Sequence, residues 1–135
     1  MKKLVLIIGV MILINIIFAV VMRAQEQLTP AKSYTCTGKT ELGLYEVMLS
    51  ITPLEKPAYR IVMVDHHMMA NGLPYVIEGV GVADHRWFLV SFFEPNQEEA
   101  YIITAYRLGV GGMRGTWITR DGDSYKEECL ERTEP

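Results

Sequence analysis

Apolar and polar residues alternate along much of the chain after about residue 30. The clearest case is the segment 45–51, where Tyr45, Val47, Leu49 and Ile51 alternate with Glu46, Met48 and Ser50. A period of two places successive side chains on opposite faces of a β-strand. One face of this strand is therefore predicted to enter a core while the other meets solvent.

Short segments of this kind recur at intervals of roughly 10 to 14 residues, with turn residues between them, as in barrels and sandwiches. Strands are predicted at residues 32–39, 45–51, 59–65, 75–82, 86–93, 99–107, 116–119 and 125–130. The segment 66–72 is expected to be a long connection, and the glycine-rich segment 109–115 to lie between strands. Because the connections are short enough for hairpins, the pattern predicts an all-β fold, an eight-stranded antiparallel up-and-down β-barrel.

Glycine and cysteine positions add detail to this barrel. Gly79 and Gly81 are two residues apart in one strand, which predicts a bend, a bulge or a neighbour packed where side chains are missing. The last hairpin is expected to turn on 121–123, where Gly122 supplies a positive φ. Cys36 and Cys129 are the two cysteines of the chain, and in an exported protein they favour a disulfide over two reactive thiols. Such a bond would join the last strand to the first.

The N-terminus has the pattern of an export signal. Lys2 and Lys3 precede residues 4–22, an uncharged and largely apolar run. Cleavage after Ala24 is expected, with an uncleaved membrane anchor as the alternative, because the run approaches the ~20 residues that span a bilayer. The predicted organisation is a signal peptide or signal anchor at 1–24, an extended lead-in at 25–31, and a β-barrel at 32–135. The barrel is then periplasmic or secreted.

Charge and missing motifs limit the function. Removing residues 1–24 takes three of the 13 basic residues and none of the 16 acidic ones, which leaves 10 against 16 and a net charge of −6. The basic residues form no cluster, so nucleic-acid binding is not expected. The chain also lacks a Gly-x-Ser-x-Gly elbow and a phosphate loop before a helix. We expect a non-catalytic protein without a cofactor.

Several segments resemble small exported bacterial barrels of calycin-like type. They are 79–82 (GVGV), 89–92 (LVSF), 101–103 (YII) and 115–117 (GTW). The Gly115-x-Trp117 pair also resembles the signature of lipocalins and avidins, although in those families it lies in the first strand and here in the seventh. The resemblance implies a barrel that holds a small apolar ligand, with Trp117 at one end.

A second resemblance is carried by Tyr34-Thr35-Cys36 and the late Cys129. This placement is similar to the cysteines of periplasmic inhibitors of C-type lysozyme, which are also eight-stranded barrels. It implies a protein-interaction module such as an inhibitor of a cell-wall hydrolase. The Ser-Gly-x-x-Tyr and Trp-x-Lys-Gly segments expected of such inhibitors do not occur in this sequence.

Ligand-binding candidates are Glu78, Trp117 and Tyr45. Glu78 shares a strand face with Val76, Val80 and Val82, so it either lies inside the barrel, paired with Arg60 or Arg107, or is solvated on the outside.

The candidate metal ligands are His66 and His67. They follow Asp65 and have methionines nearby (Met63, Met68 and Met69), and imidazole with thioether ligands suits copper. His85, beside Asp84, lies in another hairpin loop. The alternative, which we favour, is a loop that carries exposed histidines.

Strand 86–93 is apolar on both faces. Trp87, Leu89 and Phe93 share one face, and Phe88, Val90 and Phe92 the other. One face must lie outside the barrel, where a second subunit, another protein, a ligand or the lead-in 25–31 would cover it. Possible partners are therefore a small apolar ligand, an envelope protein or a second copy of the chain.

Overall fold

The computed structural model describes residues 8–17, 28–70, 72–94 and 100–133. Residues 8–17, inside the expected export signal, are helical. No helix among these described residues combines the length and the apolar character that a membrane crossing requires. The expected cleavage site at Ala24 and the first part of the lead-in lie outside the described residues.

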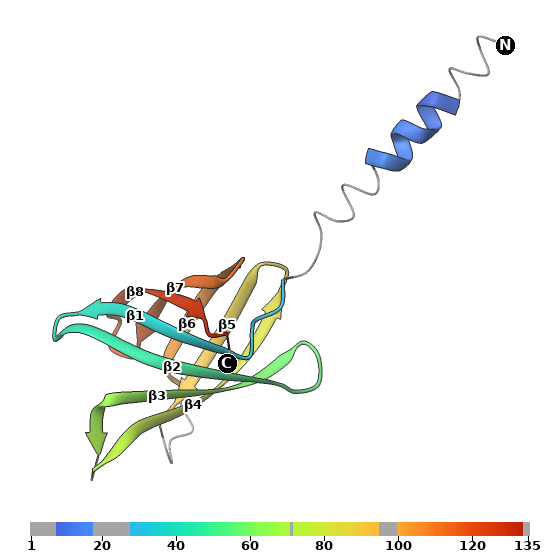
Figure 1. Ribbon diagram of the computed structural model, residues 1–135. Helices are drawn as coiled ribbons and strands as arrows, with labels where there is room; N and C mark the ends of the chain where they lie inside the picture. Colours follow the sequence, from blue (N-terminus) through green and yellow to red (C-terminus); the bar gives the residue numbers. More distant parts are fainter. Residues whose placement is uncertain (1–7, 18–27, 71, 95–99, 134–135) are drawn as a thin grey trace.

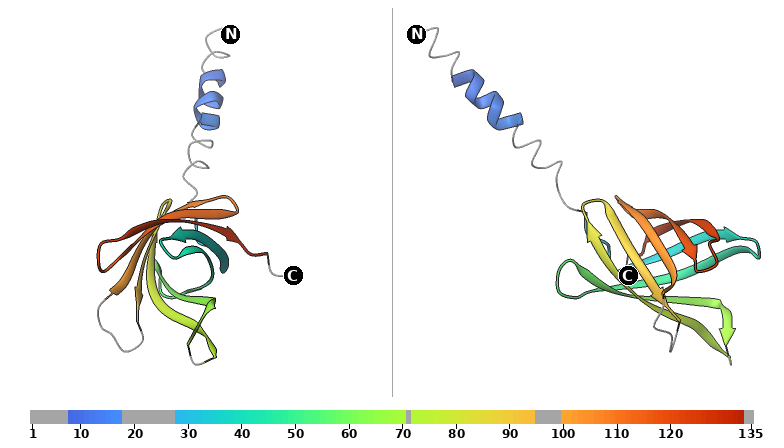
Figure 2. Two further views of the ribbon diagram at one scale, coloured as in Figure 1. Left: turned by 90° about the vertical axis from the view of Figure 1, so that its left-hand side faces the viewer. Right: turned by 180° about the vertical axis from the view of Figure 1, so that it is seen from behind.

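The described residues from Ser33 to Glu131 form one closed sheet of eight antiparallel strands, in which each strand pairs with the next and β8 pairs with β1 (Figure 1). The strands are β1 Ser33–Thr40, β2 Gly43–Pro53, β3 Ala58–Ala70, β4 Leu73–Asp84, β5 Trp87–Phe93, β6 Ala100–Gly109, β7 Gly112–Thr119 and β8 Ser124–Glu131. The predicted all-β, up-and-down barrel is confirmed. Figure 2 shows the closed sheet from two further sides, with the long β3–β4 hairpin in green.

Two strands far apart in sequence close the barrel. Cys36 of β1 and Cys129 of β8 lie directly opposite each other and form a disulfide across 93 sequence positions. The predicted hairpin between β7 and β8 is also present, and Gly122 has a φ of 92° in its turn. The prediction that a disulfide joins the first and last strands is therefore confirmed.

Aromatic rings fill the barrel interior and lie against glycines of neighbouring strands. Phe88 and Phe92 of β5 cover Gly81 and Gly79 of β4, where an added Cβ would approach the rings to 2.8 and 2.9 Å. The two glycines therefore provide space for a neighbour, as one of the sequence alternatives proposed. Other fully buried side chains are Leu49, Ile61, Ile77, Val90, Thr104 and Tyr106.

Two sequence predictions are corrected. The segment 66–72 is not a connection, because β3 continues to Ala70 past a register shift between Asp65 and Met69. An irregular pairing lets a strand continue where its alternation fails. A prediction from periodicity alone therefore placed the end of this strand too early. The glycine-rich segment is also not wholly between strands: β6 ends at Gly109 and β7 begins at Gly112.

The described part of the lead-in packs against one end of the barrel. Leu28 and Ala31 are partly buried against the core, and the Ala31 backbone N–H donates a hydrogen bond of 2.8 Å to the Tyr34 hydroxyl. In this part of the lead-in the apolar side chains pack against the barrel core. They leave Trp87 and Leu89 of β5 exposed.

Candidate functional site

Four side chains from four strands form a polar cluster inside the barrel, which we call the inner cluster: Tyr45, Tyr106, Trp117 and Glu127. Glu127 is buried, with 7% of its surface exposed. Its carboxyl group accepts hydrogen bonds from the Tyr45 hydroxyl at 2.8 Å and from the Tyr106 hydroxyl at 2.5 Å. The Trp117 indole N–H donates to the Tyr45 hydroxyl at 2.7 Å. The four groups thus satisfy one another in a cluster that is buried at Tyr106 and Glu127 and partly exposed at Tyr45 and Trp117.

Local sequence explains how a glutamate reaches the interior. Along β8, Tyr125, Glu127 and Cys129 share the inward face, whereas Lys126 and Glu128 point to solvent. Opposite Glu127, Gly115 of β7 and Gly38 of β1 have no side chains. The inward space is filled instead by the rings of Tyr106 and Tyr45, which lie where Cβ atoms of these glycines would be.

Burial changes the acidity of the inner cluster. Desolvation raises the pKa of Glu127 above its usual value, and the hydrogen bonds from Tyr106 and Tyr45 offset part of that increase. Desolvation also raises the pKa of Tyr106 and of Tyr45, and the nearby carboxylate adds to it. Both tyrosines therefore remain hydrogen-bond donors throughout the physiological range.

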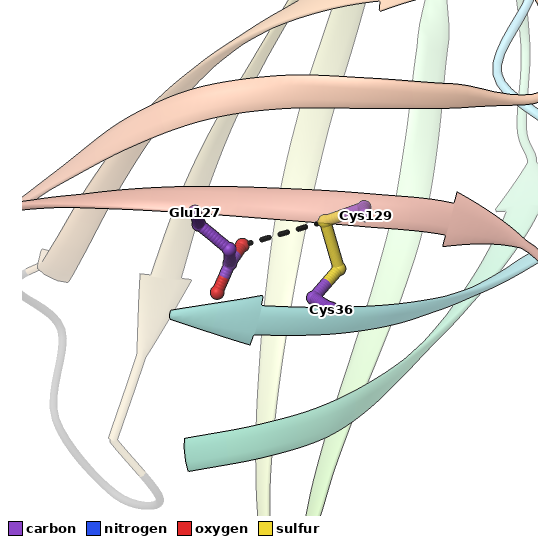
Figure 3. Close-up of side chains that lie close together, drawn as sticks. All are labelled: Cys36, Glu127 and Cys129. Atoms are coloured by element: carbon purple, nitrogen blue, oxygen red, sulfur yellow. Dashed lines mark hydrogen bonds between the residues drawn. A yellow bond between two sulfur atoms is a disulfide. The ribbon is translucent and has the colours of Figure 1, made fainter. Parts of the chain in front are cut away.

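Glu127 also touches the disulfide. Its Oε2 atom lies 3.6 Å from Cys129 Sγ, and Figure 3 shows the carboxyl group beside the bond between Cys36 and Cys129. A disulfide sulfur carries no hydrogen, so this contact is a hydrogen bond only while the carboxyl group is protonated. Potential metal-ligand atoms of the three residues lie within 4.8 Å of one another. In the oxidised state, however, neither cysteine offers the thiolate that binds a metal.

The sequence-based ligand candidates lie in different places. Tyr45 and Trp117 point inward and belong to the inner cluster, with their ring centroids 6.0 Å apart. Glu78 is on the outer surface, where its side chain is 58% exposed and bonds to Arg60 at 2.8 Å. It therefore does not line the interior, and of the two alternatives for Glu78 the solvated one is correct.

The metal candidates are not brought together. His66 and His67 are both exposed on β3, and Asp65 is buried and accepts a hydrogen bond from the His67 backbone N–H. His85 lies in the β4–β5 turn, at the opposite end of the barrel, since successive hairpins alternate between ends. Among the described residues, neither His66 nor His67 belongs to a group with metal-binding geometry.

A second candidate site covers the outside of β4, β5 and β6. We call it the outer apolar face and define it as Val80, Val82, Trp87, Leu89 and Ile103. Its five side chains are between 46% and 55% exposed. Strand pairing makes them neighbours, because Val82 lies opposite Leu89, and Ser91 lies between Val80 and Ile103. Single exposed apolar residues are ordinary, but a contiguous group is typical of an interaction surface.

Charged residues border this face on both sides. Asp84, Trp87 and Arg107 lie in one row across β4, β5 and β6. From Trp87 and Arg107 an open groove of about 570 Å³ extends over the outside of the barrel toward Lys39, and it is lined by Arg114 and other residues. A second groove, of about 590 Å³, lies beside the Arg60–Glu78 pair, Val80 and Phe93. Both grooves are on the outer surface.

Sequence reasoning missed Glu127. It stands between Lys126 and Glu128, in a segment that looks uniformly polar. One signal could have revealed it: Glu127 precedes Cys129 by two residues, so both share a strand face. If the disulfide is buried, the carboxyl group beside it is buried too.

The fold defines the class of the protein, a closed eight-stranded antiparallel β-barrel with a disulfide between its first and last strands. Comparisons with protein-family models and with curated proteins found no match. Among solved structures, the chain is similar to one described as a redesigned beta barrel. The TM-score is 0.62 at 12% identity, over 76% of this chain and 91% of that one. This likeness supports the barrel fold alone and does not confirm the resemblance to calycin-like proteins or lysozyme inhibitors.

Proposed function

We propose that this protein is an exported, non-catalytic interaction module of the cell envelope that binds a protein through its outer apolar face. The observation that carries the proposal is the contiguous exposure of Val80, Val82, Trp87, Leu89 and Ile103. Burying apolar surface contributes about 25 cal/mol per Å², so a partner that covers these side chains gains affinity from each of them. The disulfide supports export, because such bonds persist outside the cytoplasm.

The geometry favours protein binding over a small apolar ligand held inside the barrel. Phe88, Phe92, Tyr106 and Leu49 occupy the interior as fully buried side chains. Among the described residues, Glu127 is one of three buried polar side chains, with Asp65 and Thr104, and its carboxyl oxygens are already bonded to two tyrosines. The two described grooves are both outside. An inhibitor of a cell-wall hydrolase would be one kind of interaction module, but the segments expected to inhibit the enzyme have no counterpart in this chain.

Site-specific photocrosslinking tests the proposal. A photoreactive amino acid replaces Leu89 on the outer apolar face in one variant and Ser50, on the exposed face of β2, in a matched control. After irradiation of the cells that make the protein, the Leu89 variant is expected to give a discrete crosslinked protein species and the Ser50 variant is not. Equal crosslinking from both positions, or none from Leu89, would contradict the proposal.

A further inference from the structure

We propose that the partner of the outer apolar face is the same face of a second copy of this chain, related by a two-fold axis that runs along β5. This inference rests on the proposed function, because it names the partner of the same surface. Two features carry it: the closed sheet and the order of charges across β4, β5 and β6.

The closed sheet limits how two copies can associate. In an open sheet, an edge strand offers unpaired backbone groups that a second chain can extend. Here every strand is paired on both sides, since β8 closes onto β1. Copies of the barrel must therefore meet through side chains, face against face. A two-fold interface of this kind uses the same patch on both subunits, so the patch must be complementary to itself.

The outer apolar face meets that condition. With the axis along β5, the outside of β4 in one copy lies over the outside of β6 in the other. Strand register then sets Val80 against Ile103 of the partner subunit and Leu89 against the partner's Leu89. Apolar side chains thus meet apolar side chains across the interface.

Charges at the border match in the same arrangement. Asp84 and Arg107 lie on either side of Trp87 in one row, on β4 and β6. Exchanging β4 and β6 between copies places Asp84 on the partner's Arg107, and Arg107 on the partner's Asp84. Within the described part of the chain, Arg107 makes no ion pair. Asp84 approaches only the exposed His85, at 3.7 Å. Both charges are therefore available for an intermolecular pair.

The same charges disfavour the other face-to-face arrangement. A two-fold axis across the strands, through the middle of the face, would keep β4 over β4 and reverse its direction. On β4, Glu78 and Asp84 flank Val80 and Val82 of the outer apolar face. That axis would set Asp84 against the partner's Glu78, an acidic residue already paired with Arg60. It would therefore form no new ion pair and would bring two carboxylates together across the interface. The charge order therefore selects the axis along β5.

A charge-exchange experiment tests the interface. The variants Asp84→Arg and Arg107→Asp each create two like-charge contacts in a homodimer. Mixing the two variants restores two Arg–Asp contacts in a heterodimer. We expect the purified wild-type protein to be dimeric by sedimentation and native mass spectrometry. Each single variant should have a dimer dissociation constant at least about tenfold higher than that of the wild type. The mixture should form a heterodimer in the concentration range in which the wild type dimerises.

The control is Asp121→Arg, an equal charge change in the exposed β7–β8 turn, which should leave the dimer intact. Circular dichroism of each variant verifies that it is folded. A monomeric wild type, or a mixture that stays monomeric, would overturn the inference. If the wild type is monomeric while position 89 still crosslinks to a different protein, the dimer is wrong and the proposed function stands. If position 89 crosslinks to nothing, both are wrong.

Discussion

At the scale of single residues, Glu127 is the group whose surroundings differ most from those of an ordinary glutamate. It is buried beside the disulfide and accepts hydrogen bonds from two tyrosines. Burial raises the pKa of Glu127 in the folded protein. At pH values between the unfolded and the folded pKa, the folded state therefore holds a proton that the unfolded chain has already released. Folding stability tied to this group is therefore fully present below the unfolded pKa of about 4.5 and is lost as the pH rises through the folded pKa.

The prediction is that Glu127→Gln removes this part of the pH dependence. Glutamine has almost the same shape and no charge, so the interior no longer contains a group that must ionise. Relative to the wild type, the variant should lose less thermal stability as the pH rises above about 4.5, the ordinary pKa of a glutamate side chain. Melting curves across that range measure the difference. The control is Glu128→Gln, which alters the exposed partner of Arg114 and should have little effect. Parallel pH profiles for wild type and Glu127→Gln would contradict the assignment.

Whether the sequence predicts that a side chain points into the barrel also differs from residue to residue. The alternation of Tyr45, Val47 and Leu49 identified an inward face correctly, because their polar neighbours point to solvent. Glu127 was missed because the polarity of a residue normally indicates solvent, and only its register with Cys129 shows otherwise. Glu78 remained ambiguous for the related reason that Val76, Val80 and Val82 on the same face are apolar, although that face lies outside.

At the scale of elements, the pairing of β1 with β8 closes the fold. Among the described strands, it is the one pair whose members do not follow each other in sequence, so its closure spans a long stretch of chain. The Cys36–Cys129 disulfide fixes this pair and shortens the loop that the unfolded chain must close. In the chain-entropy account a loop of 93 residues corresponds to about 4 to 5 kcal/mol.

We therefore predict that the double variant Cys36→Ala/Cys129→Ala lowers the free energy of unfolding by up to about 4 to 5 kcal/mol. Urea unfolding of both proteins measures the change. A thiol reductant should destabilise the wild type and leave the double variant unaffected, which separates loss of the covalent bond from loss of the sulfur atoms in the core. Equal unfolding midpoints for the two proteins would show that strand pairing alone closes the barrel.

Element boundaries followed the sequence wherever alternation was regular. All eight strands were predicted, and their short hairpins gave the order in the sheet. β3 was predicted too short because its pairing shifts register after Asp65, and periodicity cannot anticipate an irregular pair. The start of β7 was missed because Gly112 and Gly115 resemble turn residues, yet they make room in the barrel for neighbouring backbone and the Tyr106 ring.

At the scale of the whole molecule, the N-terminal segment is the basis of the proposed export. Residues 1–24 have the composition of an export signal, and the disulfide is consistent with an oxidising compartment. We predict that the mature protein begins at Gln25. Mass spectrometry of protein from the cells that make it should give a mass without residues 1–24. An intact N-terminus in the membrane fraction would instead identify an uncleaved anchor.

The closure of β8 onto β1 has a topological consequence. The Arg132 backbone N–H donates a hydrogen bond to the Ser33 carbonyl, so the end of the last strand lies beside the start of the first. Each strand is hydrogen-bonded to two others, and β1 and β8 complete the circle, so the hydrogen-bonded sheet itself has no first strand. The strand order of this chain is one of eight circular permutations that would give the same sheet. The disulfide already supplies, through sulfur, the link that a circular polypeptide would make through its backbone.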